Sequence, residues 1–187
     1  MVKLTKGEQS KNRIIECAAN LFIVKGYNAT GVNDILELTK LPKGSFYFHF
    51  ASKKALAIEV SKYFDEKING WVENLSKKKD WKEFIDSLLN EMIRGAEVDK
   101  HFGCPFAVLG LEIAFSEPDI SDYYLEAMKK LIDNFKNIFI FSGLDAFRAD
   151  DLANKAFSIY EGYLVYYRIS KDIDVLKRMK TDLKELY

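Results

Sequence analysis

Cysteine and histidine are both scarce in this chain of 187 residues, which contains two of each. Cys17 and Cys104 are far apart and form no metal-ligand or redox pair, which favours a reducing compartment over a disulfide scaffold. Neither His49 nor His101 has a second ligand at a usable spacing. We therefore expect no metal and no other cofactor.

Long apolar runs are absent too. None approaches the roughly 18 residues that cross a bilayer, and the N-terminus lacks the apolar core of a signal peptide. The chain also contains no glycine-rich phosphate loop, no metal-binding pair and no nucleophile with a recognisable base. These absences predict a cytoplasmic protein that does not bind a membrane and is not an enzyme.

Apolar side chains are abundant and make up 48% of the residues, which predicts a globular protein with a sizeable core. The formal net charge is zero, but residues 1–54 contain nine Lys and Arg against four Asp and Glu. The remainder therefore has the opposite excess. A basic N-terminal third suggests a DNA-binding module joined to a part that does not bind DNA, with chance scatter of surface charge as the alternative.

Every long segment has helical periodicity and none alternates like a strand, so we predict an all-α protein. A capping box opens a first helix at Thr5 and Gly26 ends it, while Thr30 is expected to cap a short second helix. Lys40-Leu41-Pro42 breaks that helix, and a third follows over residues 43–49. Ser52 caps a fourth helix over residues 53–75, about 33 Å long, which can join two domains.

The rest of the chain is also predicted to be helical. Asp80 opens a fifth helix, and residues 106–115 are apolar nearly all round except Glu112, which indicates an enclosed helix. Two long helices are expected over residues 119–141 and 150–169, and the second contains four tyrosines, a residue type enriched at interfaces. Burial within the monomer is the alternative for each tyrosine. A last amphipathic helix contains Ile173 and Leu183.

The most informative stretch is KGSFYFHFASK, residues 43–53, in which four aromatic rings accompany two serines, a histidine and two lysines. One side of such a helix can pack inward, and we assign Phe46, Phe48 and Phe50 to that side. The other side offers hydrogen bonds and charge. This is the profile of the second helix of a helix-turn-helix, which lies in the major groove of DNA.

These elements, and residues 10–62 in particular, resemble the TetR family of transcriptional regulators. The match rests on the pattern GSFYxHFxSKxxL from Gly44 to Leu56, which is preceded at matching distances by Phe22, Gly26, Tyr27, Thr30, Val32 and Ile35. The family commonly has glycine where Lys40 stands and often has serine where Pro42 stands. We therefore expect a positive φ at Lys40 and a slightly different path of the turn.

The resemblance implies a DNA-binding domain over residues 1–52 and a larger helical domain over residues 53–187 that binds an effector and dimerises. It implies a homodimer joined by the helices 119–141 and 150–169. It also implies a repressor that leaves a pseudo-palindromic double-stranded DNA operator when a small molecule binds. Ser45 would touch a base, and Lys43 a base or a phosphate. The remaining DNA contacts, to phosphates and sugars, would come from Thr30, Tyr47, His49 and Lys53.

An effector pocket is expected among the fifth to eighth helices and would suit an apolar or aromatic molecule. Its candidate lining residues are Met92, Phe106, Ile113 and Tyr163, with ordinary core packing as the alternative for each.

A second hypothesis is a thiol-based redox or electrophile sensor. Cys104 precedes Pro105 at a predicted helix N-terminus, which would lower the pKa of the thiol, with Lys100 and His101 nearby. A buried structural cysteine is the alternative.

Overall fold

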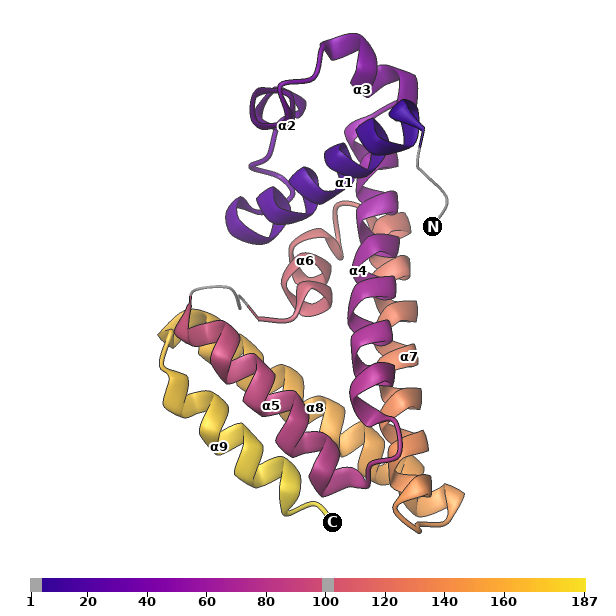
Figure 1. Ribbon diagram of the computed structural model, residues 1–187, viewed down its shortest axis with the longest axis vertical. Helices are drawn as coiled ribbons and strands as arrows, with labels where there is room; N and C mark the ends of the chain where they lie inside the picture. The colour runs from indigo at the N-terminus through magenta and orange to yellow at the C-terminus, as the bar shows by residue number, and fades with distance from the viewer. Residues whose placement is uncertain (1–4, 99–102) are drawn as a thin grey trace.

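The computed structural model describes residues 5–98 and 103–187, and within these ranges the chain forms nine helices and no strand (Figure 1). The predicted all-α class is confirmed. Three short or medium helices, α1 (Lys6–Lys25), α2 (Val32–Thr39) and α3 (Lys43–His49), gather at one end of the elongated molecule. From there α4 (Lys53–Ser76) runs to the larger group of helices at the other end.

The N-terminal helices begin and end largely where local signals predict. The Thr5 side chain accepts the N–H of Glu8 and the Glu8 carboxylate accepts the N–H of Thr5, which completes the capping box. Gly26 ends α1 with a φ of 94°, and Ser52 caps α4. The second helix differs, because its N-cap is Gly31 and not Thr30. The Gly31 N–H donates to the Asp34 carboxylate at 2.7 Å.

The larger group contains α5 (Trp81–Glu97), α6 (Pro105–Ile113), α7 (Pro118–Phe141), α8 (Ala146–Ser170) and α9 (Ile173–Lys184). Here α7 packs along both α4 and α8, while α5 and α8 both pack on α9. Trp81 anchors this core: its ring stacks on Phe139 with centroids 3.9 Å apart, and its Nε1–H donates to the Leu183 carbonyl at 2.6 Å. The predicted Asp80 capping box is present at the start of α5.

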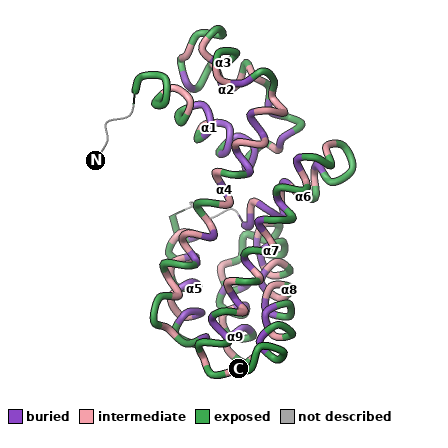
Figure 2. Tube along the Cα trace, turned by 90° about the vertical axis from the view of Figure 1, so that its right-hand side faces the viewer, coloured by how far each residue is buried: buried purple, intermediate pink, exposed green. Residues whose placement is uncertain are grey.

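Two helices after α5 differ from expectation. α6 ends at Ile113, and the exposed loop that follows it, with Phe115, stands out in Figure 2. Leu111 is exposed as well, so this helix is not enclosed. α8 begins at Ala146, capped by the Asp145 side chain, four residues before the predicted start. Of its tyrosines, Tyr160 and Tyr167 are buried within the monomer.

Candidate nucleic-acid interface

The turn between α2 and α3 is set by a lysine in a left-handed conformation. Lys40 has φ 55° and ψ 28°, which confirms the expected positive φ. Pro42 precedes α3, and its carbonyl accepts the N–H of Ser45 at 2.8 Å. Phe46 and Phe50 are buried, and together they anchor α3 against the core. One face of α3 therefore holds the helix in place.

The opposite face of α3 carries aromatic and basic side chains. Tyr47 is 51% exposed and Phe48 is 82% exposed, so the inward assignment of Phe48 is wrong. Residues 46 and 50 are one helical turn apart and share a face, whereas residue 48 lies about 200° away from residue 46 around the axis. Lys43 is exposed, with its Nζ 5.9 Å from the Tyr47 ring centroid. The side chains of Ser45 and His49 are half-buried beside this surface.

Two of the predicted contact residues support the loop between α1 and α2 from inside. The Thr30 side chain is fully buried, and its hydroxyl donates to the Gly26 carbonyl at 2.7 Å instead of facing solvent. The Lys53 ammonium donates to the carbonyls of Tyr27 and Thr30 at 3.0 and 3.1 Å and lies 4.3 Å from the Tyr27 ring centroid. The structure thus gives Thr30 a packing role, and two of the three ammonium protons of Lys53 are engaged in holding the loop before α2.

Hydrogen bonds join this domain to the larger one. The Glu112 carboxylate, on α6, accepts the backbone N–H groups of Tyr27 and Asn28, each at 2.8 Å. A Cβ at Gly26 would lie 3.0 Å from both carboxylate oxygens, so glycine permits this close approach. From α8, the guanidinium of Arg168 donates to the Ile23 carbonyl at 2.6 Å. The loop after α1 is therefore held from α4 and α6, and the last turn of α1 is held from α8.

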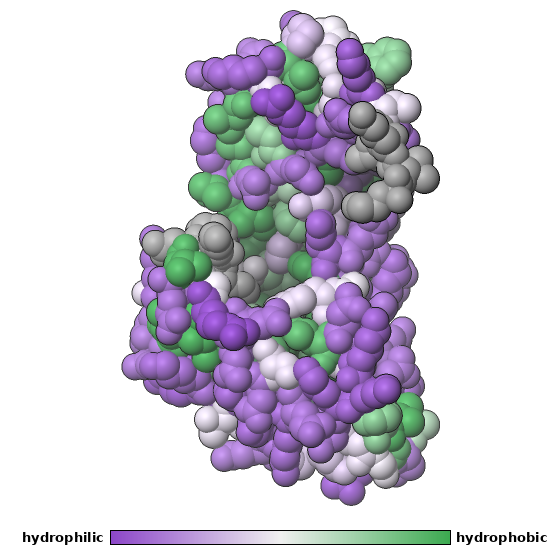
Figure 3. Space-filling view, viewed as in Figure 1, coloured by the Kyte–Doolittle hydropathy of each residue, from purple (hydrophilic) through white to green (hydrophobic). Residues whose placement is uncertain are grey.

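A cleft of about 400 Å³ lies between α1, α4 and the start of α6. Figure 3 shows a hollow between the N-terminal helices and the lower bundle, with apolar side chains gathered in it. Cys104 lines the cleft, but the other four predicted effector-binding residues do not. Met92, Phe106 and Ile113 are buried in the core, and the Tyr163 hydroxyl bonds the Asp182 carboxylate on α9. The cleft therefore lies away from four of the five residues predicted to bind the effector, and the location of the effector site stays a prediction.

The surroundings of Cys104 do not favour the thiol hypothesis. The side chain is buried, and burial raises the pKa of the thiol well above its usual value, with the neighbouring Glu161 carboxyl raising it further. These effects exceed the influence of the α6 N-terminus. The predicted neighbours Lys100 and His101 lie outside the described residues. Cys104 is thus a poor nucleophile at neutral pH.

Glu161 and Glu112 are two notable residues that sequence reasoning did not assign. Both carboxyl oxygens of Glu161 are buried without a hydrogen-bond partner among the described residues, and burial raises its pKa from 4.5 to about 7. No local signal identifies Glu161, because its neighbour Cys104 comes from a distant part of the chain. Glu112 did carry a signal, as the one charge in an apolar segment.

Within the described ranges, no group of three or more His, Cys, Asp or Glu could hold a metal ion. None of the described helices is long and apolar enough to cross a membrane.

Comparisons with known proteins agree with this architecture. Residues 14–60 match the profile of bacterial regulatory proteins of the tetR family, and residues 82–182 match the LmrA/YxaF-like C-terminal domain of transcriptional regulators. The chain is 26% identical over 183 residues to the HTH-type transcriptional regulator LmrA of Bacillus subtilis, covering 95% of this chain and 96% of LmrA. It is 25% identical over 181 residues to an HTH-type regulator in the lacX 3′ region of Lactococcus lactis, covering 90% and 88%.

Among solved structures, a TetR transcriptional regulator from Legionella pneumophila superposes with a TM-score of 0.85 at 21% identity. The match covers 99% of this chain and 98% of that one. At this identity the likeness describes the fold alone.

Proposed function

This chain belongs to the TetR family of bacterial transcriptional regulators, and we propose that it is a homodimeric repressor released from its operator by a small apolar or aromatic effector. The observation that carries the proposal is the outer face of α3. Buried Phe46 holds the helix in place while Tyr47 and Phe48 face solvent beside Lys43. Packing within the monomer does not use these exposed aromatic and basic side chains, whereas a helix in the major groove of DNA uses such side chains to contact the duplex.

Each side chain on this face suits a particular part of the duplex. The Tyr47 hydroxyl and Lys43 ammonium can bond phosphates, and Ser45 can bond a base edge. His49 can donate to the sugar-phosphate backbone from the side of α3. The exposed ring of Phe48 adds apolar area that fits a thymine methyl group. Lys53 retains one ammonium proton for a phosphate after bonding two carbonyls.

Dimerisation is assigned to α7 and α8, the two longest of the helices that follow α4 in the chain. Both leave apolar side chains exposed in the monomer: Ile140, Phe141, Phe147, Val165, Tyr166 and Ile169. A second copy of the same face would cover them in a four-helix bundle around a two-fold axis. The two recognition helices would then address a pseudo-palindromic site, with half-sites about 34–36 Å apart or a multiple of that spacing.

In this proposal residues 1–52 bind DNA, and residues 53–187 bind the effector and dimerise. α4 couples the two parts, because it starts at the Lys53 contacts and passes the cleft before it ends. An effector that favours a different tilt of α4 changes the separation of the recognition helices. An effector that binds the released conformation a few kcal/mol more tightly than the DNA-bound one empties most operators. A change from 1:99 to 99:1 in the two conformations needs about 5.5 kcal/mol.

The test is in-vitro selection from a random duplex library with the purified full chain, followed by sequencing. The proposal predicts enrichment of two-fold symmetric sequences. Enrichment of asymmetric sites, or of none at low salt, would contradict it.

A further inference from the structure

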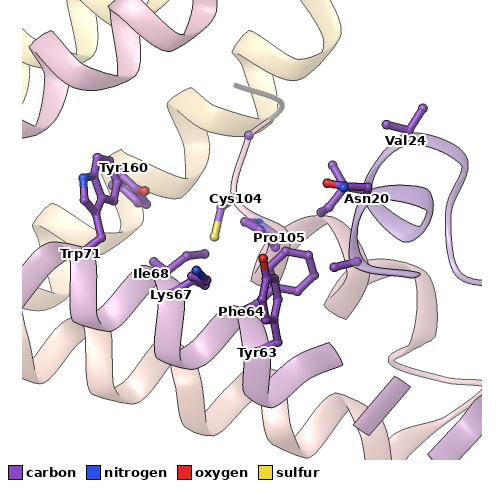
Figure 4. Close-up of a pocket in the computed structure, with 13 residues that line it drawn as sticks. Asn20, Val24, Tyr63, Phe64, Lys67, Ile68, Trp71, Cys104, Pro105 and Tyr160 are labelled. Atoms are coloured by element: carbon purple, nitrogen blue, oxygen red, sulfur yellow. The ribbon is translucent and has the colours of Figure 1, made fainter. Parts of the chain in front are cut away.

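The cleft is bordered by both parts of the molecule (Figure 4). Four of its lining residues come from α1 of the DNA-binding domain and five from α4, and the others are Gly103, Cys104, Pro105 and, from α8, Tyr160. Its volume of about 400 Å³ lies within the range of small-molecule sites. A molecule bound here would contact α1 and α4 at the same time.

Four aromatic rings line the cleft. Tyr63 and Phe64 lie on one turn of α4 and Trp71 lies two turns later, where Tyr160 of α8 is beside it. Ile23 supplies an aliphatic surface from α1. Rings attract other rings in offset or edge-on arrangements, and flat apolar surfaces exclude water from between them. This lining selects a planar aromatic molecule.

The charged side chain in the cleft indicates which charge the ligand carries. Lys67 is the charged residue of the described lining; its Nζ is 5.5 Å from the Tyr63 ring centroid and forms no ion pair with any described residue. Glu161, whose carboxyl neighbours the Cys104 thiol, is not among the described residues that line the cleft. A ligand anion can therefore pair with Lys67, whereas a ligand cation finds no carboxylate among the described residues that line the cleft.

We propose that this cleft binds a planar aromatic carboxylate, with its ring between α1 and α4 and its carboxylate on the Lys67 ammonium. Binding of this molecule to the cleft does not depend on the proposed function. Its role as the effector does, because that role rests on the chain being a repressor. Ile23 lines the cleft, and its carbonyl accepts the Arg168 guanidinium. A ring seated against Ile23 therefore acts directly on one of the bonds that fasten the DNA-binding domain to α8.

The test uses three probes that share one ring system and differ in charge: 2-naphthoate, 2-naphthalenemethanol and 2-naphthylmethylammonium. Binding to the full chain is followed by calorimetry and by quenching of Trp71 fluorescence at pH 7. We expect 2-naphthoate to bind at least about fivefold more tightly than the ammonium, the effect of one partly exposed ion pair. In Trp71→Phe the remaining fluorescence comes from Trp81, which is buried in the core outside the cleft, so 2-naphthoate should no longer quench it.

Two exposed positions allow matched variants that leave the core intact. Lys67→Met should weaken 2-naphthoate at least about threefold and leave the neutral alcohol unchanged. Val24→Glu, on the α1 side of the cleft, should weaken 2-naphthoate as well. Lys77→Met, at the exposed end of α4 outside the cleft, serves as the control and should change neither affinity.

Three results would overturn the assignment. They are tighter binding of the ammonium than of 2-naphthoate, an equal loss of 2-naphthoate affinity in Lys67→Met and Lys77→Met, and wild-type fluorescence quenching by 2-naphthoate in Trp71→Phe. Operator binding is measured separately on the same samples. A chain that binds a selected symmetric duplex but no 2-naphthoate refutes the cleft assignment alone. A chain that binds 2-naphthoate in the expected pattern but no duplex supports the cleft and refutes the DNA-binding function.

Discussion

The carboxylate of Glu112 accepts the backbone N–H of Tyr27 at 2.8 Å and so ties α6 to the loop that leads into the helix-turn-helix. The same loop is held from the other side, because Lys53 donates to the Tyr27 carbonyl. A shift of α6 must therefore move this loop or break a charge-assisted hydrogen bond. The larger domain thus has a direct mechanical connection to the DNA-binding surface.

Replacing Glu112 tests this connection. Glu112→Gln keeps one acceptor oxygen but presents an amide NH₂ to the other backbone N–H, so one donor loses its partner. We expect the free energy of unfolding to fall by about 1–2 kcal/mol in urea titrations. Glu126→Gln, at an exposed pair with Lys129, is the control and should cost less than about 0.5 kcal/mol. Equal losses in the two variants would show that the Glu112 contact does not hold the domains together.

Glu161 makes stability depend on pH. Its folded pKa of about 7 lies above the ordinary 4.5, so the folded chain keeps a proton that the unfolded chain loses between these values. This contribution is fully present below about pH 4.5, declines as pH rises towards 7, and is lost above it. Glu161→Gln should therefore be more stable than wild type at pH 8, by an amount on the order of 3 kcal/mol, and similar to it at pH 4.5.

The measurement is the difference in unfolding free energy between wild type and Glu161→Gln at several pH values. Subtraction removes the many exposed carboxylates that both proteins share. Glu73→Gln, on the exposed side of α4, should give a difference that does not vary with pH. A pH-independent difference for Glu161→Gln as well would mean that the carboxyl is ionised in the folded chain.

Cys104 should be slow to react, because its buried thiol rarely ionises. Alkylation with iodoacetamide at pH 7.5 is expected to label half-buried Cys17 before Cys104, as measured by peptide mass spectrometry. Cys104 should become reactive only in urea. Labelling of Cys104 in the native protein as fast as in the unfolded chain would revive the thiol-sensing mechanism.

The dimer interface is tested on the outward face of α8. Val165→Glu combined with Ile169→Glu places two carboxylates on each of the facing apolar surfaces, and the like charges repel across a two-fold axis. We expect a monomer in analytical ultracentrifugation that keeps its helical circular dichroism and loses at least about tenfold in operator affinity. Arg178→Glu, on the outer side of α9, should remain dimeric. A dimeric double variant would place the interface elsewhere.

Sequence reasoning succeeded where a few neighbouring residues decide the structure. The capping box at Thr5, the Gly26 stop and the Ser52 cap each depend on contacts within one turn, and all three are present. The positive φ at Lys40, also present, was expected from the glycine that the TetR family commonly has at this position. Thr30 was misassigned as a cap because the helix begins one residue later, where the Asp34 carboxylate accepts the Gly31 N–H and Gly31 offers no side-chain acceptor.

It failed where distant segments meet. The periodicity of α1 and α4 marks their apolar faces but does not reveal that these faces diverge to leave a cleft. The raised pKa of Cys104 depends on its enclosure and on Glu161, which is 57 positions later in the chain. Phe48 was misassigned for another reason: residues 46, 48 and 50 alternate as in a strand, whereas a helix turns the middle one outward.

The most direct test of the DNA-binding account is the affinity of wild type and Tyr47→Ala for a selected symmetric duplex, measured by fluorescence anisotropy at fixed salt. Tyr123→Ala, a similarly exposed tyrosine on α7, is the matched control. The account predicts that Tyr47→Ala binds at least about tenfold more weakly, a loss of about 1.4 kcal/mol, with unchanged thermal stability. Wild-type affinity in Tyr47→Ala, or an equal loss in both variants, would contradict the claim that α3 contacts DNA.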